Sequence, residues 1–399
     1  LLAKEKNKTE AALELSRSHL AQSQENFQQA RDVVDRFGIQ LADQLQGTPG
    51  TERLRQQLLL ETLNYYRGFL EKIGTADDLQ EQMAMTHLKA GVVTAKLGAS
   101  NKAIAEYQTA QRILAKLIEQ DPENAELRSQ LALSRNYLAL LLAAQGDSDA
   151  ALNEYEQAIE AQQHLVASHA ENETYAGHLA ESHVNRGTLL GQLGESAAAI
   201  QSLTHAVTIL HETAAAAPDD PQQARNLAVA YNNLSYIQRP LDANLAEKSA
   251  VRAVEILQGF AESPEVSEGV QADLALCYSN LAAIQAADER TVDAIDSYHR
   301  AIELRESLVR KSPEVVQDRS ELAASLNNLA LLEIATEDIA SAVESFRYAN
   351  RLFAALMADF PDQVAYASGW AALWNNQALA LARIERHEDA VAAYEQAVE

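Results

Sequence analysis

Residues 95–110 are AKLGASNKAIAEYQTA, and the same pattern returns as AAQGDSDAALNEYEQA at 143–158 and GQLGESAAAIQSLTHA at 191–206. In each copy a glycine follows a helix-like segment, and an alanine stands five residues after it. A second alanine comes seven residues after the first. The copies lie 48 residues apart. A fixed period of this length predicts a fold built from stacked helical units.

The alanine columns continue to the end of the chain. The first alanine stands at 103, 151, 199, 246, 294, 342 and 390, and the second at 110, 158, 206, 253, 301, 349 and 397. A mostly aromatic column lies between them, at Tyr107, Tyr155, Leu203, Ala250, Tyr298, Phe346 and Tyr394. This spacing places the three side chains on one helical face, and a small residue about twelve positions earlier indicates a preceding partner helix. The sequence therefore predicts an all-α fold of seven helix pairs.

The order of small residue, glycine, alanine, aromatic and second alanine resembles the tetratricopeptide repeat from about Ala76 to Glu399. The resemblance implies a right-handed α-solenoid, with the first helix of each pair on a concave inner wall. These repeats are longer than those of the family, and prolines such as Pro122 place about seven additional residues in each helix. We therefore expect helices of about 20–23 residues. Pro240 is expected to shorten or bend one of them.

Charge and composition narrow the classes of partner. Lys plus Arg total 32 against 57 Asp plus Glu, which gives a net charge of −25. Nucleic acids and anionic membranes bind clustered cations, so we expect a neutral or basic protein or peptide as the partner. The single cysteine, Cys277, excludes an internal disulfide framework. No apolar run reaches the roughly 18–20 residues that a membrane span requires.

The sequence contains no motif that predicts an enzyme. It has no phosphate-binding glycine loop, no G-x-S-x-G and no metal-ligand pair at helical spacing. Six of the ten histidines fall between His164 and His211, and none is three or four residues from another. A pH-sensitive patch there is one hypothesis. We predict no catalytic residue, no cofactor and no metal site.

Asparagine recurs at fixed positions in the first helices of the repeats, although it is a poor helix former. These residues are Asn136, Asn185, Asn232, Asn233, Asn280, Asn327, Asn328, Asn375 and Asn376. The family geometry implies that they face the concave groove beside Tyr236, Leu331 and Leu379. Their amides match the donors and acceptors of a peptide backbone. The N-N-L-A segment 327–330 is also similar to the repeats of the kinesin light chain, where an asparagine ladder holds a cargo peptide.

Two hypotheses therefore account for the asparagine columns. They bind an extended peptide or partner segment, or they hydrogen-bond to one another and to adjacent helices and fix the register of the repeats.

Three regions are predicted along the chain. Residues 1–46 form a stalk or coiled-coil-like helix, in which Leu13, Leu20, Phe27 and Val34 recur every seven residues. Residues 47–75 contain an amphipathic capping helix, and residues 76–399 contain the repeats. The expected buried face of the capping helix consists of Leu54, Leu58, Thr62, Tyr65, Tyr66, Phe69 and Ile73. The chain stops inside a helical pattern at Glu399, so we expect an uncovered apolar face on the last helix.

Residues 30–71, ARDVVDRF…TPGTERLRQQLLLETLNYYRGFLE, resemble the segment that joins a membrane span to long tetratricopeptide arrays in large bacterial serine/threonine kinases. That resemblance implies the scaffold or sensor region of a signalling protein, tethered through a segment N-terminal to this chain. Any kinase domain would then lie outside these residues. The primary functional hypothesis is a protein-interaction module, and the alternative is a self-association arm that forms a homodimer.

Overall fold

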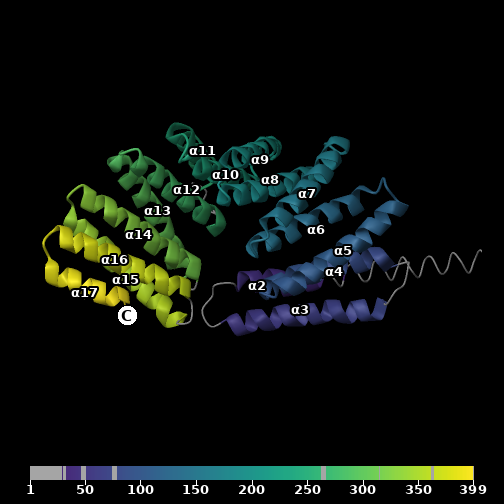
Figure 1. Ribbon diagram of the computed structural model, residues 1–399, viewed down its shortest axis with the longest axis horizontal. Coiled ribbons are helices and arrows are strands. Elements are labelled where there is room, and N and C mark those ends of the chain that lie inside the picture. The colour runs from purple at the N-terminus through teal and green to yellow at the C-terminus, as the bar shows by residue number, and fades with distance from the viewer. Residues whose placement is uncertain are drawn as a thin grey trace, which may run out of the picture. The chain divides into compact units, whose positions relative to one another are not determined.

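The computed structural model describes residues 29, 33–45, 51–73, 79–261, 267–313, 315–360 and 364–398. Within these ranges the chain is helical, and they contain no β-strand (Figure 1). The chain forms two compact units that divide at Ala161. The stalk residues Leu13, Leu20 and Phe27 lie outside the described residues, as do the predicted boundaries at 46 and 75. The division into three regions therefore stays a prediction.

The first unit begins with two short elements and a long helix. Its elements are the π-helical segment η1 (Asp35–Gln40), α2 (Leu41–Gln44), α3 (Glu52–Ile73), α4 (Gln80–Lys96), α5 (Ser100–Gln120), α6 (Ala125–Ala144) and α7 (Ser148–Ser168), which crosses the division. The second unit contains α8 (Glu173–Gln192), α9 (Ser196–Ala216), α10 (Pro221–Gln238), α11 (Ala243–Ala261), α12 (Glu268–Ala287), α13 (Thr291–Lys311), α14 (Val316–Ala335), α15 (Ile339–Asp359), α16 (Val364–Arg383) and α17 (His387–Val398).

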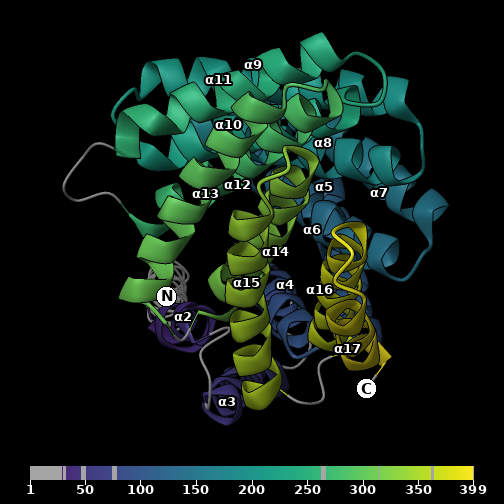
Figure 2. The ribbon, with the colours of Figure 1, turned by 90° about the vertical axis from the view of Figure 1, so that its left-hand side faces the viewer.

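From α4 onward the described helices form seven consecutive pairs, α4/α5 to α16/α17, as the repeat predicts. Figure 2 shows one of these pairs, α14 and α15, side by side. Ten of the thirteen helices from α4 to α16 have 20 or 21 residues, within the predicted range. The other three, α4, α10 and α11, have 17, 18 and 19 residues. The fold is thus all-α, with the helical-repeat architecture that the sequence predicts.

The small residues lie where helices pack. Ala294 and Ala301 of α13 have no exposed surface, and Tyr298 between them is buried. The preceding helix contributes the small residue that the aromatic ring covers. In the first repeat, a Cβ added at Gly91 would lie only 2.6 Å from the Tyr107 ring. The predicted contact between two helices through small residues is confirmed.

The turn inside each pair requires a left-handed residue. Gly146 has a φ of 85°. Its N–H donates to the Ala143 carbonyl, and the next N–H donates to the Leu142 carbonyl, both at 3.0 Å. These two bonds form a Schellman motif, which satisfies the last carbonyls of α6. Glutamates occupy this position in three later repeats, at Glu289, Glu337 and Glu385, with φ of 59°, 64° and 61°.

The fourth repeat is irregular, as its proline predicts. Its first helix, α10, ends at Gln238, two residues before Pro240. It has 18 residues, whereas α8 and α12 have 20. Because proline has no N–H to donate and its ring crowds the preceding turn, the helix stops early. The predicted shortening is confirmed.

The buried stripe of α3 differs from the predicted one. Leu54 and Tyr65 were expected on the buried face, but both are exposed. Tyr66, which was also expected there, is buried, and so are Leu59 and Leu63, which were not expected. These three side chains pack against α4 and the short elements before α3. The segment LLL at 58–60 offers several equivalent apolar faces, so periodicity alone did not select the correct one.

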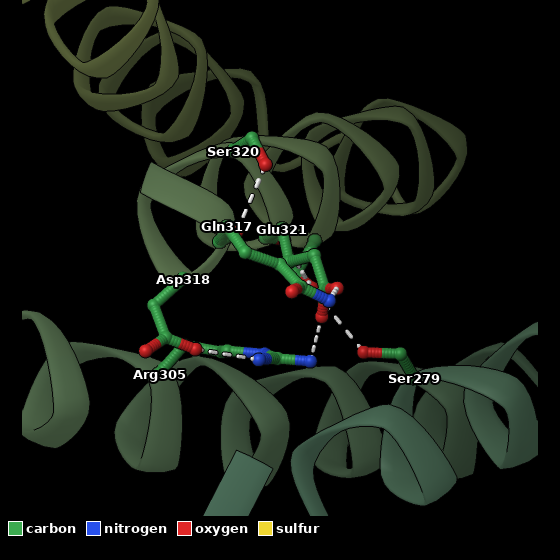
Figure 3. Close-up of polar contacts among 7 residues, drawn as sticks. Ser279, Arg305, Gln317, Asp318, Ser320 and Glu321 are labelled. Atoms are coloured by element: carbon green, nitrogen blue, oxygen red, sulfur yellow. Dashed lines mark hydrogen bonds and ion pairs between the residues drawn. The ribbon is translucent and has the colours of Figure 1, made fainter. Parts of the chain in front are cut away.

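One arginine occupies a core position in the second unit. Arg305 of α13 is 3% exposed and stands where the equivalent helices α9 and α11 have leucine. Figure 3 shows its guanidinium between two carboxylates of α14. It donates to Asp318 at 2.8 Å and also to Glu321. These two bonds offset the cost of burying the charge and connect one repeat to the next.

Candidate functional site

The first helices of the repeats in the second unit form a continuous layer. The helix α10 contacts α8 and α12, and α14 contacts α12 and α16. The second helix of each pair contacts the first helix of its own pair and of the next pair. Direct contact between successive first helices puts them on the side of the stack where the repeats are closest. We call this layer, formed by α8, α10, α12, α14 and α16, the first-helix wall.

The asparagines of the predicted columns differ widely in exposure. Asn136 on α6 in the first unit and Asn232 on α10 are buried, with 1% and 5% of their surfaces exposed. Asn185, Asn233, Asn280, Asn327 and Asn376 are half-buried. Asn328 and Asn375 are exposed. The columns are therefore a mixture of structural and accessible amides.

Two pairs of asparagines connect neighbouring first helices. Asn280 on α12 donates from Nδ2 to the Oδ1 atom of Asn232 on α10, at 2.7 Å. Asn376 on α16 donates to Asn327 on α14 at 3.0 Å. We call the position three residues before the small residue of each first helix the first column, and the position two residues before it the second column. Each bond joins the second-column asparagine of one repeat to the first-column asparagine of the repeat before it. These pairs support the register hypothesis for the four residues that form them.

A second-column asparagine lacks this bond to the preceding repeat when that repeat has no asparagine in its first column. For Asn233, the first-column residue of the preceding repeat is Val184, which cannot form this bond. Within the described ranges Asn233 has no hydrogen-bond partner. The corresponding residue for Asn328 is Ser279, whose hydroxyl lies 3.2 Å from that of Ser325. The Asn233 amide is therefore unpaired, whereas the exposed Asn328 side chain accepts from Asn327 at 3.3 Å and hydrogen-bonds to Tyr298.

Large apolar side chains are exposed beside these amides. Tyr236, Leu331 and Leu379 directly follow the buried small residue of α10, α14 and α16, and they are 58%, 41% and 52% exposed. Their position one residue after the buried one turns them away from the partner helix and out of the wall. The Arg239 guanidinium lies 5.3 Å from the centre of the Tyr236 ring. The exposure of these three side chains is compatible with the predicted groove, whose role in peptide binding stays a prediction.

A cavity of about 460 Å³ opens between α8 and α10. A recess of this size can hold several peptide side chains. Asn233 and Tyr236 line it together with Asn280 and the apolar side chains Leu203 and Ile237. Polar amides and apolar surface therefore meet in one recess.

A second cavity, of about 560 Å³, lies along the N-terminal halves of the same two helices. Glu173 and Glu181 of α8 and Asp273 of α12 line it. Its arginine, Arg225, donates to Asp273 at 2.7 Å. Carboxylates outnumber cations in this cavity, which favours a basic ligand group at this end of the helices.

Several lining residues were not predicted from the sequence. Thr188 follows the buried Gly187 and so occupies the same position on α8 as Tyr236 on α10. The repeat alignment could have identified it, but a polar threonine in a column of large apolar residues gave no signal. Gln192 also lines the cavity, and no column marks it.

The histidine-rich segment brings two rings together in the folded chain. His183 and His205, on α8 and α9, have ring centroids 5.2 Å apart. Among the described residues, no group of three or more His, Cys, Asp or Glu side chains is arranged to hold a metal ion. None of the described helices combines the length and the apolar character required to cross a bilayer.

The comparisons with known proteins agree with this architecture. The tetratricopeptide repeat model matches residues 135–164, 180–209 and 371–399. BtubC (BKLC) from P. vanneervenii shares 22% sequence identity, and the match covers 65% of this chain and 92% of that chain with a TM-score of 0.52. This structural similarity shows a shared fold.

Two other solved structures are more distant. The nuclear import adaptor Nro1 of S. pombe is 10% identical, with a TM-score of 0.49 and coverage of 73% of this chain and 98% of that one. The apo form of RapI is 13% identical, with a TM-score of 0.48 and coverage of 79% and 96%. No curated protein sequence matches the chain.

Proposed function

Since the chain belongs to the tetratricopeptide repeat family, we propose that it is a non-enzymatic protein-interaction module that binds an extended segment of a partner protein on the first-helix wall. The observation that carries this proposal is the cavity in which the unpaired Asn233 amide stands beside the exposed Tyr236 ring. The amide offers donors and acceptors to a peptide backbone, and the ring offers apolar contact to a side chain.

The two cavities of the α8–α10 pair suggest the size of the bound segment. Their lining residues on α8 extend from Glu173 to Gln192, which is about 28 Å at the helical rise of roughly 1.5 Å per residue. An extended peptide of about eight or nine residues covers this distance at roughly 3.3 Å per residue. We propose a peptide with a basic side chain near Glu173 and Glu181 and an apolar side chain near Tyr236.

A peptide-display selection on the full chain tests this proposal. We expect the selected peptides to combine a basic residue with an apolar one, and to lose binding to an Asn233→Ala, Tyr236→Ala double variant. The control is Asn244→Ala, Leu245→Ala, which changes exposed residues of α11 outside both cavities. Circular dichroism verifies that each variant keeps its helicity. Selected peptides that bind both double variants equally well would exclude this groove.

Self-association is the second candidate function. Residues 1–28 of the N-terminal stalk that would carry it lie outside the described residues. The last helix, α17, exposes Val391, Tyr394 and Val398. Tyr394 belongs to the column in which Tyr298 and Phe346 are buried. Light scattering on the chain with and without residues 1–40 measures the contribution of the stalk, and a dimer that becomes a monomer supports the arm.

We further propose that the chain is the scaffold or sensor region of a larger signalling protein related to membrane-tethered serine/threonine kinases. The support is the sequence resemblance of residues 30–71 to the linker of such kinases. The coding sequence upstream of Leu1 tests the proposal, because it should then encode an apolar span and a kinase domain. An upstream sequence that encodes neither would refute it.

A further inference from the structure

The first unit contains a basic cavity in an otherwise strongly acidic chain. It has a volume of about 510 Å³ and lies between α3, the end of α4 and the start of α5. Four cationic side chains line it, Arg55, Arg67, Lys96 and Lys102, and no carboxylate does. Lys96 donates to Asp43 at 2.7 Å, outside the lining. Within the described ranges, Arg67 and Lys102 have no anionic partner.

The start of α5 adds further positive potential to this cavity. Gly98 and Ala99, immediately before the helix, line the cavity. The cap residue Ala99 has no side-chain acceptor, and the first turn of α5 carries no acidic residue. The equivalent residue of α15, Asp338, accepts a bond from the Ser341 N–H at 3.2 Å. The first N–H groups of α5 therefore lack the anionic cap of α15, and a helix N-terminus favours an anion at this position.

A buried hydroxyl in the same cavity has no partner. Thr94 of α4 is 1% exposed, and its Oγ1 atom forms no hydrogen bond within the described part of the chain. Other helical threonines donate to the carbonyl one turn earlier, as Thr86 does to Gln82 at 2.7 Å. A buried hydroxyl without a hydrogen-bond partner destabilises a folded chain. A ligand oxygen in this cavity would satisfy it.

The repeat pattern explains why this hydroxyl is free. The residue equivalent to Thr94 in the fifth repeat is Gln285, which accepts from Ser297 on the second helix at 2.7 Å. In the first repeat the position of Ser297 holds Glu106, and its carboxylate lies 2.7 Å from the His87 ring nitrogen. Thr94 therefore has no partner of the kind that Ser297 supplies in the fifth repeat.

We propose that this cavity binds a phosphate monoester. The dianionic phosphate group would accept bonds from Arg67, Lys102 and the Thr94 hydroxyl at the N-terminus of α5. The apolar walls formed by Leu60 and Leu63 would contact the organic part of the ester. The cavity is far larger than a single phosphate ion, which favours an ester over the free ion.

Calorimetric titration of the full chain with inorganic phosphate, at constant ionic strength, tests the charged part of the site. We expect the Arg67→Gln, Lys102→Gln double variant to bind at least about tenfold more weakly, because each charge-assisted bond is lost. The control Arg112→Gln, Lys116→Gln removes the same charge from an exposed part of α5 and should bind like the wild type. Equal affinities in the wild type and both double variants would overturn the proposal.

Thr94 provides a second readout that a purely structural residue would not give. Thr94→Val should weaken phosphate binding by about fivefold while leaving the melting temperature of the free chain unchanged or higher, because it removes an unpaired buried hydroxyl. Thr94→Ser should retain the affinity. If Thr94→Val destabilises the free chain and leaves phosphate affinity unchanged, the hydroxyl has no role in binding and the site is wrong.

The source of the ester is resolved by comparing O-phosphoserine with glycerol phosphate. Tighter binding of phosphoserine indicates a phosphorylated protein side chain, and tighter binding of glycerol phosphate indicates a small phosphorylated metabolite. Both outcomes support a phosphate ester site, whereas the proposal is contradicted if neither ester binds more tightly than inorganic phosphate. The Asn233→Ala, Tyr236→Ala variant should bind phosphate normally, because its substitutions lie in the second unit.

Discussion

The dependence of stability on pH should centre on His183. This residue is 5% exposed on α8, and its Nδ1 atom has no hydrogen-bond partner within the described ranges. Burial, together with the nearby His205 and Arg186, lowers the pKa of His183 to about 4. A protonated imidazole there would be a buried cation beside another cation, so the folded chain holds the ring neutral.

The sign and size of the effect follow from linkage. In the unfolded chain the histidine has its ordinary pKa of 6.5, so between pH 6.5 and about 4 the unfolded chain binds a proton that the folded chain does not. The stabilisation from the neutral ring is complete above pH 6.5 and is lost as the pH falls through 4. The difference in pKa corresponds to about 3 kcal/mol, at roughly 1.4 kcal/mol per unit.

Native-state hydrogen exchange of the amides in α8 and α9 measures this loss of stability locally. A local measurement is needed because long repeat arrays need not unfold as one cooperative unit. After correction for intrinsic exchange rates, the wild type should lose about 3 kcal/mol more opening free energy than His183→Gln between pH 7 and pH 4. His211→Gln, at an exposed position of α9, is the control and should follow the wild type. The same pH dependence in His183→Gln and the wild type would refute this account.

Three other substitutions test the packing of the repeats. Arg305→Leu should cost about 3–5 kcal/mol in urea denaturation because Asp318 loses its buried partner, and the double variant Arg305→Leu, Asp318→Leu should recover most of it. Burial raises the pKa of Glu333, so the folded chain favours its protonated form and loses this stabilisation as the pH rises. Because glutamine stays neutral, Glu333→Gln should raise the melting temperature more at pH 8 than at pH 5. Gly146→Ala should cost about 1 kcal/mol at its φ of 85°, whereas Gly259→Ala, within α11, should not destabilise the chain in the same assay.

The repeated packing was predictable from the sequence because it depends on small residues at fixed spacing. Ala294 and Ala301 can be assigned to a helix contact without coordinates, since only small side chains allow such an approach and the period excludes coincidence. The left-handed backbone of Glu337 could not be predicted in this way. Glycine is the usual residue at such a turn, and a glutamate there gives no local signal. The same reasoning also failed for Arg305, whose burial depends on carboxylates supplied by the next helix.

The candidate peptide site was predictable only as a column, and the contacts between helices determine which of its members are accessible. Recurrence identified the asparagines without distinguishing a peptide ladder from a register device. The structure pairs Asn280 with Asn232 because the repeat before Asn280 supplies an asparagine in the first column. The repeat before Asn233 supplies Val184 instead, so the Asn233 amide stays unpaired. One column therefore contains both paired and unpaired amides, and the residue in the preceding repeat determines which of the two an asparagine becomes. This dependence is why we propose that the α8–α10 pair binds the peptide backbone, since the Asn233 amide there is not bonded within the fold.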